Sequence, residues 1–494
     1  MAVNTEYGVK STHPDYDANL RRWQKVRNVL AANCKTYLRD VGASEPDPEI
    51  AKKRQDEYAD GAIFYNFTKR TLSGMVGAVI RKDPEIDLPA QLEYLKTNCD
   101  GSGIGLLQHA QDSLTELDSL GRGGLLVDAP QAKAATRAEQ NAGRLNPRIL
   151  FYTAENIIHW HYRKVGSTKV LDMVILREQY EYQVDGQEFW WECGELYRVL
   201  EIVDGRYRQR VFTFGYDGEQ SGYEEVIDIA ERIDIPFTFI GSDNNDGTVD
   251  APPLESLADV NIGHYRNSAD VEDSSYICSQ PTLMLYPGEN MDPNTFKELN
   301  PNGIRIGSRT GHNLGAGGAA ELIQATESNL ARSLMADKEN QAVMIGAQLI
   351  TPTIQVTAEA ARLQRGADTS IMATIAKNVS MAYEQAIAWC AEFINATGEI
   401  VFELNTEFFM QQLTAQDRAA WIADINAGLL PARSYYAAMR AAGTTNWTDE
   451  EIEDELERQP PAPAPTLNTQ VSGEIPQAPD ESQQDNQQQD NQGG

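Results

Sequence analysis

The chain has few cysteines, and their spacing suits neither a disulfide framework nor a zinc site. Five cysteines are scattered over 494 residues, and no two are spaced as C-x-x-C. This pattern predicts reduced and mostly buried thiols. His159 and His161 would share one face of a strand, but no third ligand lies close in sequence. We therefore expect surface histidines, no metal and no cofactor.

Long apolar runs are also absent. No stretch approaches the roughly 18–20 apolar residues that span a bilayer. Residues 1–15 are polar and lack the apolar segment of a secretory signal. These features predict a protein without a membrane partner that stays in the cytoplasm of the cell that makes it.

Basic residues are scarce, which constrains the partners of the chain. It carries 73 acidic residues against 42 lysines and arginines, a net charge of −31. The longest basic run, Lys52-Lys53-Arg54, is too short to form a phosphate-gripping face, so any contact with DNA should be loose. Signatures of catalysis such as G-x-S-x-G, H-E-x-x-H or a phosphate-binding loop are missing. We expect no enzymatic activity and name no catalytic residue.

The first half of the chain reads as helices followed by a β-meander. Apolar spacing predicts helices at 16–38, 49–60 and 104–120 and a buried segment at 64–79, where Gly74 and Gly77 indicate close packing against another element. Alternation then predicts antiparallel strands, with 235–240 as the last of the meander. A Gly/Asn/Asp-rich segment, 241–253, is the strongest predicted domain boundary. The predicted strands are residues 124–128, 157–162, 170–182, 189–202, 207–214 and 235–240.

Three long helical patterns dominate the next region. The first runs from 252 to about 278, and an insert of short strands and turns follows. The second runs from about 326 to 346 and is broken by a Pro-containing segment, 349–354 (LITPTI). The third continues to about 396, with Gly366 as a candidate kink. Leu254, Leu257, Ile262 and Tyr265 form an apolar stripe on the first helix.

The C-terminal part is predicted as small helices and a disordered tail. Helices are expected at 414–426, 431–442 and 449–457, the last with a capping box formed by Thr448 and Glu451. From residue 459 the composition is mostly Pro, Gln, Asn and Asp, which predicts disorder.

Several segments, together with the helix–insert–helix–loop–helix order, resemble portal proteins of tailed bacteriophages. The resemblance covers about residues 15–445 and lies in structural motifs, without a catalytic signature. The segments are 65–74 (YNFTKRTLSG), 121–128 (GRGGLLVD), 155–158 (ENII) and 253–266 (PLESLADVNIGHYR).

The resemblance implies an α+β architecture with a mixed α/β wing, a two-helix stem, a small β-containing clip, a long kinked helix and a short helical crown. Its expected divisions are a wing (1–250), a first stem helix (251–278), a clip (279–325), a second stem helix (326–347), a tunnel loop (348–357), a long wing helix and strand (358–407), a crown (408–458) and a disordered acidic tail (459–494).

The resemblance also implies a function: a homo-oligomeric ring of about twelve subunits at one capsid vertex of the virion, assembled in the host cytoplasm. Double-stranded DNA would pass through it during packaging and ejection without sequence-specific binding. The large terminase subunit, the head–tail adaptor, capsid protein and scaffold are the implied partners. The residues expected to face DNA are Thr351, Pro352, Thr353 and Gln355. Those expected to pack the stem between neighbouring subunits are Leu254, Leu257, Ile262, Tyr265, Leu330 and Leu334.

Two alternatives remain open. Another ring-forming head–tail connector is disfavoured by the length of the chain and the order of its helices, because adaptors are usually shorter. An acidic cytosolic hydrolase with an unrecognised site would be a monomer or small oligomer with a pocket of convergent polar groups. A ring with an axial channel would remove the hydrolase interpretation.

Overall fold

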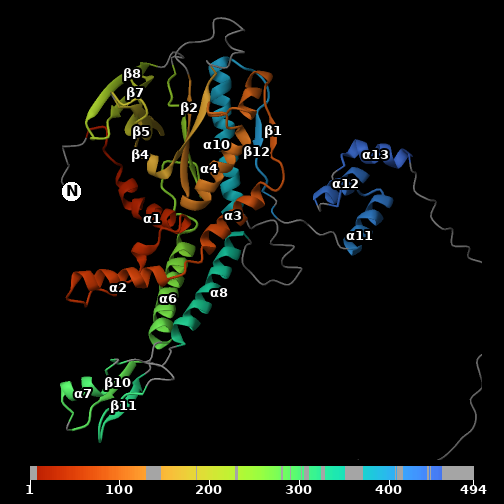
Figure 1. Ribbon diagram of the computed structural model, residues 1–494. Coiled ribbons are helices and arrows are strands. Elements are labelled where there is room, and N and C mark those ends of the chain that lie inside the picture. The colour runs from red at the N-terminus through yellow and green to blue at the C-terminus, as the bar shows by residue number, and fades with distance from the viewer. Residues whose placement is uncertain are drawn as a thin grey trace, which may run out of the picture. The chain divides into compact units, whose positions relative to one another are not determined.

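The computed structural model describes residues 8–129, 146–184, 186–227, 232–279, 282–289, 291–301, 303–304, 311–323, 329–350, 371–406, 408, 415–441, 444–445 and 447–458. They form an α+β protein, as expected, with two compact units, Met1–Phe408 and Phe409–Gly494, each described by itself (Figure 1).

The first unit begins with helices whose starts are set by capping side chains. The Asp47 carboxylate accepts from the backbone of Glu49, and the Asn66 side chain accepts from the backbone of Lys69. The helix expected at 16–38 ends at Leu30, because Ala32 takes a left-handed conformation (φ +60°) that stops it. The helices are α1 (Pro14–Leu30), α2 (Pro48–Gly61), α3 (Phe67–Val79) and α4 (Leu106–Leu120), with short 3₁₀ turns η1 (Lys35–Tyr37) and η2 (Ala90–Lys96).

The two glycines of α3 do not pack closely, contrary to expectation. A Cβ added at Gly74 or Gly77 would meet no atom within 4 Å. The core-facing side of α3 is formed instead by its larger residues, including Leu72, Met75 and Val79.

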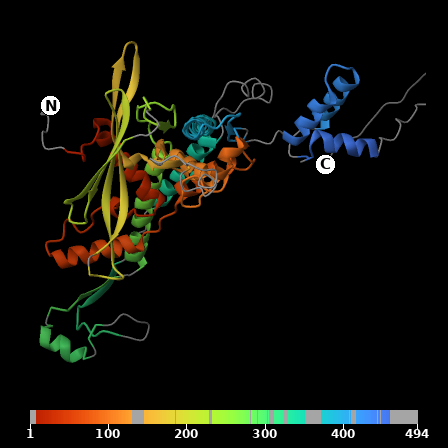
Figure 2. The same ribbon diagram turned by 90° about the horizontal axis from the view of Figure 1, so that it is seen from above.

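Two separate antiparallel sheets follow. Strand β2 (Arg122–Asp128) lies between β3 (Arg148–Thr153) and β9 (Phe237–Gly241), with Leu125 opposite Phe151 and Thr238. The strand expected to end the meander, β9, therefore belongs to a different sheet, because it pairs with β2. The meander has the order β4 (Ile157–Val165), β5 (Thr168–Gln183), β6 (Trp191–Val203), β7 (Arg206–Phe214) and β8 (Gln220–Ile227), preceded by the 3₁₀ turn η3 (Ala154–Asn156). Figure 2 shows its long strands beside the helices.

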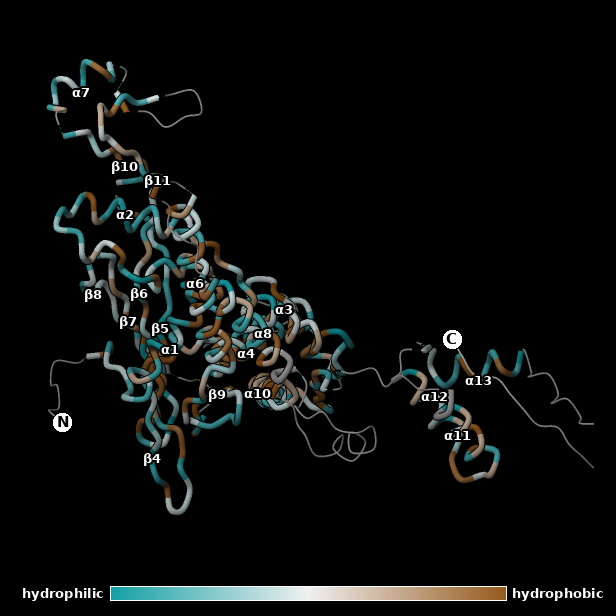
Figure 3. Tube along the Cα trace, turned by 90° about the horizontal axis from the view of Figure 1, so that it is seen from below, coloured by the Kyte–Doolittle hydropathy of each residue, from teal (hydrophilic) through white to brown (hydrophobic). Residues whose placement is uncertain are grey.

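A long helix, α10 (Ile371–Ile394), forms the centre of the core. Its apolar residues pack into the same cluster as those of α4, β2 and β9, and hydrophobic segments recur along α4, α8 and α10 (Figure 3). One buried polar network joins α4 and α10: the Tyr383 hydroxyl lies 2.7 Å from His109 Nδ1 and 2.8 Å from Ser113 Oγ. A two-stranded sheet of β1 (Glu85–Asp87) and β12 (Val401–Glu403) lies beside it.

Between β9 and α10 the chain forms a helix pair separated by a small β insert (Figure 1). The second helix runs to Ile350 and so includes the first three residues of the segment 348–357 that was expected to be the tunnel loop; the rest of that segment lies outside the described residues. The insert also contains a short helix that the sequence analysis did not predict. The elements are α6 (Glu255–Ser279), β10 (Thr282–Tyr286), α7 (Pro293–Leu299), β11 (Ala319–Ile323) and α8 (Leu330–Ile350).

The second unit contains α11 (Ala415–Asn426), α12 (Ala432–Ala441) and α13 (Asp449–Arg458). The expected capping box is confirmed. The backbone of Thr448 donates to the Glu451 carboxylate at 2.9 Å, and the backbone of Glu451 donates to the Thr448 hydroxyl at 3.2 Å. Arg433 forms two hydrogen bonds to Glu453, which fastens α12 to α13.

A buried arginine ties the two sheets of the first unit to the segment before α6. The Arg122 guanidinium lies 4.4 Å from both the Trp160 and the Phe239 ring centres, and it donates to the carbonyl of Thr248 at 2.5 Å. Burial lowers its pKa to about 10, so it stays charged at neutral pH.

Segment 241–253 therefore does not act as a free linker, contrary to the expected boundary. The Asp250 carboxylate is buried and accepts from the backbone of Asp243 at 2.8 Å. Gly121 ends α4 in a left-handed conformation (φ +74°), and a Cβ there would meet the carbonyl of Ala251 at 2.7 Å. The division into compact units falls after Phe408 instead.

Replacing the buried arginine should destabilise the first unit. Arg122→Leu removes the donor to Thr248 and the cation between the two rings, so we expect the free energy of unfolding to fall by about 2–4 kcal/mol. Urea unfolding followed by tryptophan fluorescence measures it. The control is Arg206→Leu at the exposed first residue of β7, which should change stability by less than about 0.5 kcal/mol. Equal effects of the two substitutions would contradict this role of Arg122.

A second prediction concerns Asp118, which is fully buried in α4 with neither carboxyl oxygen hydrogen-bonded to a described residue. Burial raises its pKa to about 8, against about 3.9 in an unfolded chain. The folded state then holds a proton that the unfolded state releases. As the pH rises from about 4 to 8, the free energy of unfolding of the wild type should therefore fall, relative to that of Asp118→Asn, by up to about 1.4 kcal/mol per pH unit.

Urea titrations at a series of pH values from 5 to 8 would show this difference in slope. The exposed Asp112, on the same helix, supplies the control: Asp112→Asn should keep the wild-type slope. A wild-type slope that Asp118→Asn leaves unchanged would rule out Asp118 as its source.

Candidate assembly interface on the paired helices

The first helix of the pair, α6, is buried within its own chain over its first half, up to Ala269. Leu254 and Leu257 are fully buried, and Ile262 and Tyr265 are 5% and 4% exposed. These four residues were expected to pack between subunits. In the structure they pack inside the chain, because the N-terminal helices α1, α2 and α3 cover α6. These helices are far from α6 in sequence, so the sequence pattern gave no sign of this contact.

Charged groups fix the start of α6 against α1. Arg22 donates two hydrogen bonds to the Glu255 carboxylate, and Lys25 lies 2.8 Å from Asp259. The hydrogen bond from Arg22, opposed by partial burial, lowers the pKa of Glu255. The Glu255 carboxylate therefore stays ionised at neutral pH and helps to hold α6 against α1.

A buried amide joins α6 to α3. The Asn261 Oδ1 accepts from the Thr68 hydroxyl at 2.9 Å, and its Nδ2 donates to the carbonyl of Tyr65 at 2.8 Å. Asn261 and Thr68 are both fully buried, so each would lose a hydrogen bond if the helices separated.

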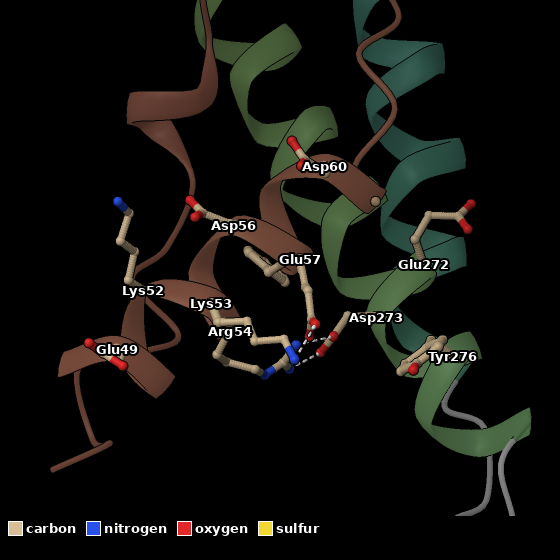
Figure 4. A pocket seen from close by; sticks show the side chains of 12 residues that line it. Glu49, Lys52, Lys53, Arg54, Asp56, Glu57, Asp60, Glu272, Asp273 and Tyr276 are labelled. Carbon is tan, nitrogen blue, oxygen red and sulfur yellow. Dashed lines mark hydrogen bonds and ion pairs between the residues drawn. The ribbon is translucent and has the colours of Figure 1, made fainter. Parts of the chain in front are cut away.

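Between α2 and the second half of α6 lies an open groove of about 900 Å³ (Figure 4). Arg54 crosses it and donates to both oxygens of Asp273 at 2.6 Å, and the Tyr58 hydroxyl donates to Asp270 at 2.7 Å. Hydrogen bonding to Asp273 raises the pKa of Arg54. These charges neutralise one another, so the groove presents no poised nucleophile–base pair among its lining residues.

The second helix, α8, packs on α6 through small residues and one side-chain stem. A Cβ added at Gly263 would meet Lys338 Cε at 2.8 Å, which places the Lys338 stem over α6. The buried His264 lies 3.2 Å from the Glu339 carboxylate. Ala342 is buried, and Gly346 approaches Thr71 of α3. Small side chains at this contact let the two helices approach closely.

The rest of α8 exposes large apolar side chains. Leu334 is 40% exposed, Val343 71% and Met344 62%. Leu330 is 66% exposed, so the two expected stem residues of α8 lie on its surface. At 3.6 residues per turn, Leu330, Leu334 and Met344 share one face within roughly 80°, and Val343 points elsewhere. A helix covered on one side only, with apolar residues on another, indicates a surface that a partner covers.

The sequence analysis named Leu330 and Leu334 but missed Met344. The signal was present, because Met344 lies fourteen residues after Leu330 and therefore only about 40° from it around a helix. Thr351, Pro352, Thr353, Gln355 and the candidate kink at Gly366 lie outside the described residues, which resume at Ile371.

The insert between the helices is a two-stranded antiparallel sheet with α7. Leu283 pairs with Leu322 and Tyr286 with Ala319, and all five residues of β11 are exposed. A two-stranded sheet with an exposed strand has little stability of its own. This insert is therefore a second surface that contact with another chain would stabilise.

The two histidines considered as metal ligands both lie on strand β4. His161 lies 2.7 Å from Asp172, and His159 lies near His13. The described residues contain no group of three or more His, Cys, Asp or Glu placed to hold a metal ion. Among the same residues, no helix combines the length and hydrophobicity needed to cross a membrane.

Comparison with known proteins gives one family match. A family described as "Domain of unknown function (DUF4055)" matches residues 253–394, the stretch from α6 to the end of α10. The match covers less than half of the chain. No curated protein matches the chain in sequence.

Two solved structures are similar in part. A chain of the virion of a native gene transfer agent particle has a TM-score of 0.37 and 15% identity, covering 74% of this chain and 86% of its own length. A chain of the neck of an empty gene transfer agent particle has a TM-score of 0.38 and 15% identity, covering 82% and 95%. TM-scores of this size do not establish a shared fold.

Proposed function

We propose that this chain is the subunit of a phage portal, a homo-oligomeric ring at one capsid vertex through which DNA is packaged and ejected. The observation that carries the proposal is the exposed apolar face of α8, on a helix pair that brackets a β insert. The same region contains segment 253–266, which resembles portal proteins. In a ring, this face of each α8 packs against the neighbouring subunit, and the burial of its apolar side chains stabilises the assembly.

In this proposal α6 and α8 form the stem, and the insert of β10, α7 and β11 forms the clip that docks the large terminase subunit and later the head–tail adaptor. Residues 348–357, of which 351–357 follow the end of α8, supply the tunnel loop. Capsid protein and scaffold contact the outer parts of residues 1–250. The unit that begins at Phe409 supplies the crown.

The charge of the chain suits a channel that moves DNA without holding it. A net charge of −31 gives a surface that repels phosphates, and weak binding permits rapid passage. Thr351, Thr353 and Gln355 would offer short polar contacts without a charge-assisted grip.

Size-exclusion chromatography with light scattering, followed by electron microscopy of the peak, tests the ring. We expect a closed ring of about twelve subunits with an axial channel. Leu334→Glu with Met344→Glu places two charges on the proposed contact, and we expect it to shift the protein to monomers or small oligomers while its unfolding midpoint stays within a few degrees. Because both side chains are exposed in the single chain, the fold should tolerate them.

The matched control is Val343→Glu, an exposed apolar position on another side of α8. It should leave the ring intact. If Val343→Glu abolishes the ring and the double variant keeps it, the contact between subunits does not lie on the face of α8 that contains Leu334 and Met344. If the purified chain stays monomeric, the same comparison is made with scaffold and capsid protein present, and a monomer there would refute the proposal.

A second prediction concerns the tunnel loop. Thr353→Lys introduces a cation that would attract the DNA backbone, so we expect packaging to slow by about twofold or more. A motor assay with terminase, DNA and empty procapsids that carry the variant measures the rate. Thr353→Ser serves as the control, since it keeps a hydroxyl and adds no charge. An unchanged rate for Thr353→Lys would place this residue away from DNA.

Another ring-forming head–tail connector is the alternative nearest to this proposal. It would also form a ring, but it would join preassembled capsids and would not support terminase-driven packaging. An acidic hydrolase would form no channel. The ring and packaging measurements together separate the three functions.

A further inference from the structure

Two turns at one end of the five-stranded sheet form a continuous surface. The turn between β5 and β6 and the turn between β7 and β8 meet there, because the strands alternate in direction. The backbone of Tyr216 in one turn donates to the Tyr182 hydroxyl beside the other at 3.1 Å. The Tyr180 hydroxyl likewise lies 3.1 Å from Ser221 Oγ.

This surface exposes large aromatic side chains to an unusual degree. Single exposed aromatic residues are common on proteins, but a cluster marks an interaction site. Tryptophan and tyrosine are also the residues that most often dominate binding energy at interfaces. The cluster, which we term the aromatic end, consists of Phe189 (88% exposed), Trp190 (60%), Trp191 (57%), Tyr216 (79%) and Tyr223 (51%).

The two segments that carry these rings are acidic. Among the described residues, cations from elsewhere in the chain reach only their inner residues: Lys10 pairs with Glu195 and lies 4.1 Å from the Phe214 ring centre, and Arg198 pairs with Glu178. Residues 178–197 and 214–227 contain no lysine, arginine or histidine. The exposed or half-exposed acids among the described residues there include Glu181, Glu188, Glu192, Asp217 and Glu219. These five acids form no ion pair with a described residue, and an aromatic surface with such carboxylates beside it is complementary to a cationic ligand.

The turns that present the rings are fixed by hydrogen bonds. The backbone of Val184 donates to Trp190 at 3.2 Å, and Gln183 Nε2 donates to the carbonyl of Glu188 at 2.6 Å. In the other turn the backbone of Gly215 donates to Glu219 at 2.9 Å. A surface held in place in this way loses little conformational entropy on binding.

We propose that the aromatic end docks an arginine-rich segment of a partner protein. Arginine stacks on indole and phenol rings and also forms paired hydrogen bonds with carboxylates, so one side chain uses both features of the surface. Lysine provides only a point charge. Nucleic acid and anionic lipid are repelled by the acids, and a second copy of this chain brings a net charge of −31. This inference does not depend on the proposed portal function.

Fluorescence anisotropy of a labelled eight-arginine peptide, titrated with the full chain, tests the proposal. The variant Trp190→Ala with Trp191→Ala should weaken binding about tenfold. An eight-lysine peptide should bind several-fold more weakly than the arginine peptide, because it stacks less well on the rings. The control variant is Trp447→Ala, an exposed tryptophan just before the acidic helix α13, where Arg440 already pairs with Asp449. It should bind like the wild type.

Two further outcomes decide the matter. If the double variant unfolds, Glu188→Gln with Tyr216→Ala replaces it, since both side chains are exposed, and weaker arginine binding by this variant supports the proposal. If the arginine and lysine peptides bind equally well and neither variant weakens their binding, the attraction is a general one to an acidic protein. That result would overturn the proposal. Self-association that the tryptophan substitutions abolish, with no peptide binding, would assign the surface to a second copy and also overturn it.

Discussion

The first unit depends on a charge buried between two aromatic rings. Arg122 lies between Trp160 of the meander and Phe239 of the three-stranded sheet, and it holds the backbone of Thr248 just before α6. Burying a guanidinium is costly unless its donors are satisfied and its charge is compensated. Because the compensation comes from three segments distant in sequence, those segments must assemble together. The position of α6, and thus of the helix pair, follows from this constraint.

The two helices of the pair differ in where their apolar residues lie: those of α6 are buried in the chain, and several of those of α8 are exposed. Helix α6 buries Leu257 and Tyr265 against elements of its own chain, and polar contacts such as Asn261 to Thr68 set the fit. Helix α8 uses small residues against α6 and leaves Leu334 and Met344 at the surface. One helix therefore anchors the pair, and the other offers a face to a neighbour. In the proposed ring, the exposed face of α8 would contact the neighbouring subunit.

The acidic residues of this chain have different partners in different parts of the structure. The net charge of −31 disfavours binding to DNA phosphates, which is consistent with the proposed channel. Within the fold, acids that face α1 or α2 are paired with Arg22, Lys25 or Arg54. Near the aromatic end Lys10 pairs with Glu195, but acids such as Glu188 and Asp217 form no ion pair with a described residue and are available to the proposed cationic partner.

Local patterns in the sequence determined the helices, most strands, the capping box at Thr448 and the buried stripe of α6, since each depends on neighbours a few residues apart. Tertiary structure alone decided which surfaces those elements bury. Strand β9 pairs with β2, segment 241–253 packs around Arg122, and α6 is covered by helices that precede it by about 200 residues in sequence. Apolar spacing shows that a helix has a face to bury, but the identity of the covering element depends on contacts between distant segments, which periodicity does not encode.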